Sequence, residues 1–79
     1  MAKMIVFFHP TCGPCHELKK WLNEKNIEYV SKDASEPENY EEFQSKGFQF
    51  TPTSIIVDEN NKEHIVIGFN KSKIEQLLS

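Results

Sequence analysis

The two cysteines of the chain, Cys12 and Cys15, are separated by two residues within the stretch HPTCGPCHELKKWL. Two thiols at this spacing can close a disulfide within one helical turn, or can supply two ligands to a metal ion. Because His16 follows directly, the string C-x-x-C-H is also the attachment signature of c-type haem. The spacing therefore leaves three kinds of chemistry open: thiol-disulfide exchange, metal binding and haem attachment.

The surrounding residues argue against haem and zinc. The only methionines, Met1 and Met4, lie upstream of the cysteines, whereas an axial haem ligand is expected further along the chain. Zinc could take both cysteines together with His9 and His16. However, His16 directly follows the second cysteine and points about 100° away from it on a helix, and structural zinc usually joins two separate segments. We expect no cofactor beyond a disulfide between the cysteines, and keep a small zinc-binding module as a second hypothesis.

The composition restricts the partners and the compartment. Nine lysines, no arginine and 12 acidic residues give a net charge of −3, which argues against nucleic acid as a partner. The apolar run over residues 4–8 is too short for a signal-peptide core or a membrane span, so we expect a cytoplasmic protein with no membrane association. Structural disulfides are kept reduced in the cytoplasm, which favours catalysis or metal binding for one close cysteine pair.

Three elements in the first half of the chain must position the pair. Residues 3–8, KMIVFF, form an apolar run that is typical of a strand buried on both faces. From Pro14 the apolar residues recur at three- and four-residue steps, which predicts an amphipathic helix to about Lys25. Residues 27–31, IEYVS, alternate and predict a second strand, so that strand, helix and strand make a parallel βαβ unit.

A second helix and a hairpin are predicted next. Ser35 and Glu38 have capping-box spacing for a helix that should stop at Gly47. Residues 53–58, TSIIVD, and 62–67, KEHIVI, flank a short link with two asparagines and predict an antiparallel hairpin.

The chain is predicted to end in a helix over residues 71–79 that Asn70 caps. The order β-α-β-α-β-β-α then predicts a single α/β domain over residues 1–79, a four-stranded mixed sheet flanked by three helices.

Cys12 is predicted to lie at the N-terminal cap of the first helix. A residue before proline is pushed out of the α region, so Gly13 should be non-helical and Pro14 should start the helix, and both set the geometry of the pair. The N–H groups of the first turn, including that of Cys15, then favour the Cys12 thiolate, which is the nucleophilic form. Cys15 lies on the apolar side of the helix, where desolvation keeps it a thiol. We therefore expect Cys12 to attack a partner's disulfide and Cys15 to resolve the mixed disulfide.

Three motifs together resemble those of the thioredoxin superfamily. CGPC occupies residues 12–15 at a strand-to-helix turn, TPT occupies residues 51–53 before the hairpin, and GF occupies residues 68–69 ahead of the last helix. With its short first strand, the chain looks like a small glutaredoxin-like redoxin over essentially all 79 residues. The resemblance implies the thioredoxin fold and the activity of a thiol-disulfide oxidoreductase acting on protein disulfides.

The resemblance also implies a substrate-binding surface around the cysteines. The matching proline of the family is cis and faces the cysteine pair, whereas the sequence alone favours a trans Thr51-Pro52 bond. A cis-proline there lacks an N–H and leaves the carbonyl and amide of Thr51 for pairing with an extended partner segment. By the same resemblance, Thr11, Gly68 and Phe69 are expected at the substrate-binding surface.

The chain departs from both branches of the superfamily in ways that bear on its reductant. Glutaredoxins that use glutathione usually carry Gly-Gly and an acid at the start of the last helix, where this chain has GFNK over residues 68–71. Thioredoxins usually carry a tryptophan where this chain has Thr11, and an acid in the first strand, yet the Gly13-Pro14 dipeptide is of the thioredoxin type. The combination is similar to the redoxins that donate electrons to ribonucleotide reductase and are recharged by thioredoxin reductase. We expect the chain to be a monomer. A glutathione-dependent glutaredoxin is the alternative.

Aromatic and charged residues around the pair have two interpretations each. Phe48, Phe50 and Phe69 can frame an apolar rim for a partner protein, although at least one of them should belong to the core. Lys19 and Lys20 are expected on a solvated helix face, and their place near the helix start is the basis of the alternative, that they favour an acidic partner.

Overall fold

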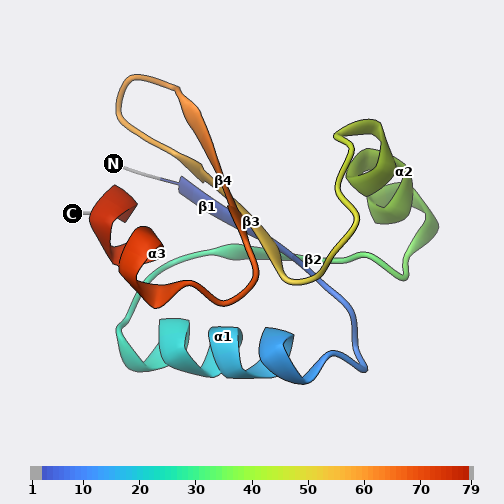
Figure 1. Ribbon diagram of the computed structural model, residues 1–79, viewed down its shortest axis with the longest axis horizontal. Helices are drawn as coiled ribbons and strands as arrows, with labels where there is room; N and C mark the ends of the chain where they lie inside the picture. The colour runs from blue at the N-terminus through green and yellow to red at the C-terminus, as the bar shows by residue number, and fades with distance from the viewer. Residues whose placement is uncertain (1–2, 79) are drawn as a thin grey trace.

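The computed structural model of the protein describes residues 3–78 and shows an α/β architecture built on one mixed sheet (Figure 1). Its elements, in chain order, are β1 (Lys3–Phe8), α1 (Gly13–Glu24), β2 (Val30–Asp33), α2 (Pro37–Ser45), β3 (Thr53–Val57), β4 (Glu63–Ile67) and α3 (Lys71–Leu78). The strands lie in the order β2-β1-β3-β4, with β1 parallel to β2 and antiparallel to β3, and with β4 antiparallel to β3. Within the described residues, the predicted fold class is confirmed.

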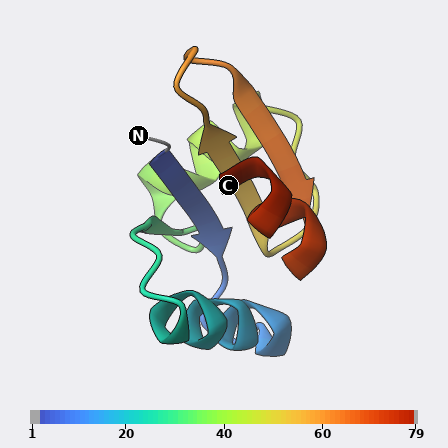
Figure 2. The same ribbon diagram turned by 90° about the vertical axis from the view of Figure 1, so that its left-hand side faces the viewer.

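Strand β1 has a central place in the sheet because both of its faces are apolar. Met4 and Val6 are buried on the face covered by α1 and α3. The buried residues around them are Leu18, Trp21, Leu22, Ile56, Val66 and Ile74. Phe7 is buried on the other face against Phe43 of α2, and Figure 2 shows α2 and α3 on opposite sides of the sheet. The burial of β1 on both faces, predicted from its apolar run, is confirmed.

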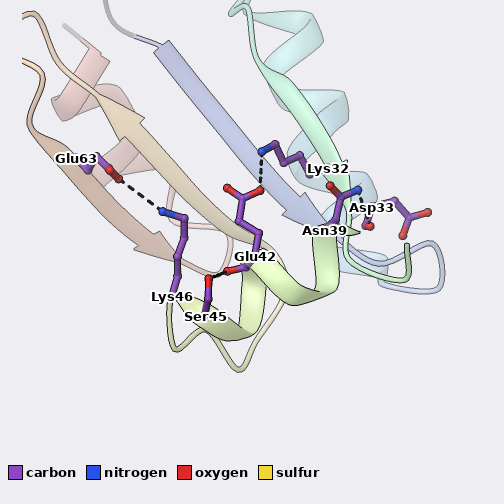
Figure 3. A network of polar contacts seen from close by, with 7 residues as sticks. All are labelled: Lys32, Asp33, Asn39, Glu42, Ser45, Lys46 and Glu63. Atoms are coloured by element: carbon purple, nitrogen blue, oxygen red, sulfur yellow. Dashed lines mark hydrogen bonds and ion pairs between the residues drawn. The ribbon is translucent and has the colours of Figure 1, made fainter. Parts of the chain in front are cut away.

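Helix α2 is tied to strands on both sides of β1 (Figure 3). Lys32 of β2 contacts Glu42 at 2.7 Å, and Lys46, directly after the helix, contacts Glu63 of β4 at 3.9 Å. Ion pairs at the surface contribute at most about 1 kcal/mol each. The apolar contact of Phe43 with the sheet therefore contributes more to holding α2 in place than these pairs do.

The second strand is displaced from its predicted position. A second strand parallel to β1 is present, as predicted, but its predicted bounds of residues 27–31 are wrong, because β2 spans Val30–Asp33 and its ladder begins at Ile5 of β1. Ile27 and Tyr29 are half-buried and pack against the core cluster beneath α1. The link from α1 thus uses its apolar side chains to close one end of that core, and their alternation is not that of a paired strand.

The predicted capping box of α2 is also wrong. The N-cap is Glu36, it makes no side-chain cap hydrogen bond, and Pro37 occupies the first turn. The hydroxyl and the backbone N–H of Ser35 instead donate to Oδ1 of Asp33, at 2.6 and 2.8 Å. Because the N-cap is Glu36, Ser35 lies outside the helix, and its hydroxyl donates to Asp33 in the turn before α2.

The predictions for the C-terminal third are confirmed apart from single residues at the strand ends. Strands β3 and β4 form the expected antiparallel hairpin. The Oδ1 atom of Asn70 accepts the N–H of Lys73 at 3.2 Å and caps α3, which buries Ile74. The predicted end of this helix at Ser79 lies outside the described residues. Within residues 3–78 no helix has the length and apolar character needed to cross a membrane.

Candidate active site

Cys12 caps helix α1, as predicted, and its sulfur lies against the first helical turn. Its backbone is extended, with φ −88° and ψ 112°, and its Sγ accepts the N–H of Cys15 at 3.2 Å. A disulfide joins the two sulfurs. The expectation that Gly13 is non-helical is wrong, because α1 begins at Gly13 with Pro14 in its first turn. Glycine has no Cβ to clash with the ring of a following proline, so the helix can include it.

The two sulfurs differ in their access to solvent. Cys12 is half-buried, whereas Cys15 is 0% exposed and lies on the buried face of α1 with Leu18 and Leu22. The N-terminus of a helix favours negative charge, and here the N–H of Cys15 points at the Cys12 sulfur. The arrangement suits a reaction in which the first sulfur meets an external disulfide and the second reaches only the first.

The segment that carries Pro52 lies beside the cysteine pair. The Thr51-Pro52 peptide bond is cis, as the resemblance implied. The carbonyl oxygen of Thr51 lies 3.7 Å from Sγ of Cys12, and the carbonyl of Pro52 accepts the N–H of Gly68 at 2.8 Å. The structure therefore brings Thr51 next to Cys12 and Gly68 next to Pro52, from segments that are far apart in the sequence.

The loop before Cys12 is held by its own side chains. The Nδ1 atom of His9 accepts the backbone N–H of Thr11 at 3.4 Å, and the Thr11 hydroxyl donates to the same atom at 2.9 Å. The Nε2 atom of His16 donates to the carbonyl of Pro10 at 2.8 Å. Both histidines thus contact the loop backbone or its side chains. Within residues 3–78, the structure contains no group of three or more histidine, cysteine and acidic side chains arranged to hold a metal ion.

Of the three phenylalanines predicted at the rim, two pack inward. Phe48 packs edge-on against Phe43 at 5.7 Å between ring centroids and joins the core beneath α2, which confirms that at least one of the three belongs to the core and makes the rim position of Phe48 wrong. Phe69 is half-buried and packs edge-on against Trp21 at 6.0 Å, on the α1 side. Phe50 is 64% exposed and directly precedes Thr51. Only Phe50 among the three presents most of its side chain to solvent near the site.

Ile67 is an exposed apolar residue near the site that the sequence reading missed. It is 63% exposed, lies opposite Thr53 in the ladder between β3 and β4, and directly precedes Gly68. The alternation in KEHIVI indicates that Ile65 and Ile67 share one face and Val66 the other, and the structure shows that Val66 is the one buried in the core. Ile67 and Phe50 thus place apolar surface on the two chain segments that flank the Thr51-Pro52 bond.

Lys19 lies over an aromatic ring and not on a solvated helix face as predicted. Its Nζ lies 3.1 Å from the centroid of the Phe8 ring, whereas Lys20 is exposed. Desolvation by burial lowers the pKa of Lys19, and the charge of Asp33 partly opposes that shift. A cation over a ring in this position covers the end of β1 just before the active-site loop.

Hydrogen bonds from Ser35 lower the pKa of Asp33 below its ordinary value of 3.8, with smaller contributions from the charges of His9 and Lys19. We predict that Ser35→Ala raises this pKa toward 3.8, because the hydroxyl donor is lost while the backbone N–H remains. A depressed carboxyl pKa stabilises the fold above the unfolded-state pKa, and this contribution is lost as pH falls through the folded-state pKa. The variant should therefore be less stable than wild type near neutrality, with the difference disappearing in acid.

NMR titration of the Asp33 carboxyl carbon, together with unfolding at several pH values, measures both effects. Ser45→Ala is the matched control, because its hydroxyl donates to the carbonyl of Glu42 at 2.8 Å and leaves Asp33 untouched (Figure 3). An Asp33 titration curve that is the same in Ser35→Ala and wild type would contradict the assignment.

The same architecture occurs in solved structures of thioredoxin-like proteins. The thioredoxin-like protein BC3987 superposes with a TM-score of 0.76 at 28% identity, covering 98% of this chain and 100% of its own. The thioredoxin NaTrxh from Nicotiana alata superposes with a TM-score of 0.75 at 25% identity, covering 95% of this chain and 68% of its own. With its cysteine pair joined at the start of α1, this protein is a thiol-disulfide oxidoreductase of the thioredoxin fold.

Within that class the chain belongs to the glutaredoxin family, whose model matches residues 4–60. It is 34% identical over 74 residues to an uncharacterized glutaredoxin-like 8.6 kDa protein in the rubredoxin operon of Clostridium pasteurianum, covering 92% of this chain and 93% of the relative. It is 27% identical over 78 residues to a prophage-derived thioredoxin-like protein of Bacillus subtilis strain 168, covering 96% of this chain and 94% of that protein. Its relatives thus carry both glutaredoxin-like and thioredoxin-like names.

Proposed function

We propose that this protein is a monomeric, cytoplasmic dithiol donor that reduces disulfides of partner proteins and is recharged by thioredoxin reductase. The observation that supports this proposal is the position of Cys12. This half-buried residue lies at the N-terminus of α1 beside Thr51, whereas Cys15 is completely buried. One close cysteine pair fits a compartment in which structural disulfides are kept reduced. Ribonucleotide reductase is the candidate partner that the resemblance suggests.

The proposed reaction proceeds in two exchanges that conserve atoms and electrons. The Cys12 thiolate attacks one sulfur of the partner's disulfide, and the other partner sulfur leaves as a thiolate that takes up a proton. Cys15 then loses its proton and attacks Cys12, which forms the Cys12-Cys15 disulfide and releases the first partner sulfur as a second thiolate. The partner gains two electrons and the protein loses two. Cys15 supplies one of the two protons that the partner thiolates take up, and the other comes from solvent, which received the Cys12 proton when the thiolate formed. Thr51 and Pro52 present the partner segment to Cys12.

The start of α3 supports thioredoxin reductase over glutathione as the reductant. Glutathione-using relatives carry an acid there, whereas this chain has Asn70, whose Oδ1 already accepts the N–H of Lys73. Phe69 replaces the second glycine of those relatives, and its ring lies between Trp21 and Lys71, with Nζ of Lys71 5.2 Å from its centroid. Neither side chain offers a carboxylate to the charged end of the tripeptide.

Exposed apolar side chains support a protein as the partner. Phe50 and Ile67 are both more than half exposed and lie on either side of the Thr51-Pro52 segment. Large apolar side chains that remain exposed beside a reactive group are typical of a docking surface for another protein. A small disulfide compound would reach Cys12 without covering either side chain.

We predict that Ile67→Ser raises the KM for a protein disulfide about tenfold, because burying an isoleucine contributes roughly 1.5–3 kcal/mol and part of that is lost. The rate with a small aromatic disulfide should stay at the wild-type value. Val30→Ser is the matched control, since Val30 is 58% exposed on β2, the opposite edge strand of the sheet from β4. Equal KM values for Ile67→Ser and Val30→Ser with the protein substrate would contradict docking at Ile67.

Two coupled assays of NADPH consumption test the reductant. The oxidised protein is supplied with thioredoxin reductase in one assay, and with glutathione and glutathione reductase in the other. Turnover with thioredoxin reductase alone supports the proposal. Turnover with glutathione alone overturns that part of it and favours a glutathione-dependent glutaredoxin, for which the glutaredoxin family match is the supporting observation. Turnover with neither would leave the chain without the proposed donor role.

A further inference from the structure

A buried hydroxyl in the middle of the sheet has no role in the reaction described above. Ser54 is 0% exposed, and among the residues that the structure describes its Oγ is a buried side-chain atom without a hydrogen-bond partner. Burying a hydroxyl without a partner costs free energy, so such a group in a native protein calls for an explanation.

The strand register determines which face of the sheet Ser54 occupies. Ser54 of β3 lies opposite Val6 of β1 and Val66 of β4, and both valines belong to the core cluster beneath α1 and α3. Ile56, two residues further along β3, belongs to the same cluster. Because side chains alternate along a strand, Ser54 faces the layer that contains α1.

Ser54 also lies at the active-site end of this layer. It follows Pro52 by two residues, and Thr51 contacts the Cys12 sulfur. On the helix side, Cys15 is the buried residue of α1 closest to the N-terminus, one turn before Leu18. The Ser54 hydroxyl and the Cys15 sulfur thus lie at the same end of this apolar layer.

We propose that the Ser54 hydroxyl is the hydrogen-bond partner of the Cys15 sulfur when the cysteine pair is reduced. In the disulfide, the Cys15 sulfur is held by its bond to Cys12 and has no proton to donate, and the Ser54 Oγ has no partner. In the dithiol, the Cys15 S–H donates to the Ser54 oxygen. In the mixed disulfide, Cys15 gives its proton to the partner thiolate released in the first exchange and attacks Cys12, which breaks the bond between Cys12 and the partner sulfur. The Ser54 O–H donates to the Cys15 thiolate as it forms, and no proton leaves Ser54.

This inference rests on the proposed dithiol reaction. It implies that the Ser54 hydroxyl has a hydrogen-bond partner in the reduced form and none in the oxidised form. Ser54→Ala should therefore favour the disulfide, because the oxidised protein loses an unpartnered hydroxyl while the reduced protein loses a hydrogen bond. We expect the equilibrium constant for disulfide formation to rise about tenfold, which is about 30 mV in reduction potential for a two-electron couple.

The test is equilibration of each variant in dithiothreitol redox buffers, with the fraction of free thiol as the readout. Ser54→Thr keeps the hydroxyl and should stay within about twofold of wild type. Thr53→Val, which removes the neighbouring hydroxyl that donates to the Phe50 carbonyl on the other face, should also stay within about twofold. An unchanged equilibrium in Ser54→Ala, or an equal shift in Thr53→Val, would overturn the proposal.

Chemical unfolding of the oxidised and reduced forms adds a second readout. Ser54→Ala should leave the oxidised protein as stable as wild type or more stable, and should destabilise the reduced protein. Equal changes in both forms would indicate a structural role only. Both measurements use a small dithiol and no reductase, so a failure to be recharged by thioredoxin reductase would not be mistaken for a failure of Ser54.

Discussion

Replacing Cys12 with serine is expected to lower the rate of protein-disulfide reduction to the rate measured without the protein. The attacking species in thiol-disulfide exchange is a thiolate, and a serine hydroxyl does not ionise in the same pH range. The Cys15 sulfur does not substitute for it, because it is 0% exposed on the inner face of α1. The measurement is reduction of a model protein disulfide such as insulin with reduced variant and no other thiol.

Loss of folding would not explain this result. Serine is a favoured N-cap residue, so Cys12→Ser keeps a side-chain acceptor for the N–H of Cys15 at the start of α1. The matched control is Cys15→Ser, which also lacks the disulfide but keeps the attacking sulfur. Reduction by Cys12→Ser above the protein-free rate would show that another group attacks the substrate.

The geometry of the cysteine pair was accessible from the sequence because local rules determine it. Pro14 and the apolar periodicity after it predicted a helix that starts next to Cys12 and buries Cys15, and both features are present. The error at Gly13 arose from applying the pre-proline rule to the one residue type that lacks a Cβ.

The errors outside the site come from competition between partners that spacing alone does not decide. Ser35 has the capping-box spacing, but the helix begins one residue later with Glu36 as N-cap, and the Ser35 hydroxyl donates to Asp33 in the turn before it. The alternation of residues 27–31 resembled a strand, yet Ile27 and Tyr29 cover the end of the core beneath α1. The start of β2 is determined by its register with β1, which is a tertiary contact.

The remainder of the site depends on contacts between distant segments. Thr51 follows Cys12 by 39 residues, and no local pattern predicts that its carbonyl lies 3.7 Å from the Cys12 sulfur. The family resemblance supplied that expectation together with the cis bond to Pro52. Ile67 and Ser54 were missed because their significance depends on which face of β3 and β4 meets the helices, and this becomes known only once the strands are paired.

Replacing Cys15 with serine is expected to leave the first exchange intact and to stop the second. Cys12 keeps its place at the α1 N-terminus and forms the mixed disulfide, but no neighbouring thiol displaces the partner. Turnover with thioredoxin reductase should cease after one exchange, and a covalent complex of protein and substrate should accumulate. This complex is measured by non-reducing electrophoresis and mass spectrometry after a single addition of a protein disulfide. Dithiothreitol should reduce the mixed disulfide and separate the two proteins.

The trapped complex also tests why Cys15 is buried. If Cys15 acts only on Cys12, as its complete burial indicates, adding an excess of a small external thiol should restore turnover to Cys15→Ser, because that thiol takes over the displacement of the partner. The same addition should not restore Cys12→Ser, which cannot form the mixed disulfide. Continued turnover of Cys15→Ser without any added small thiol, with no complex detected, would mean that a thiol other than Cys15, such as one of the reductase, displaces the partner, and that Cys15 does not perform the step assigned to it.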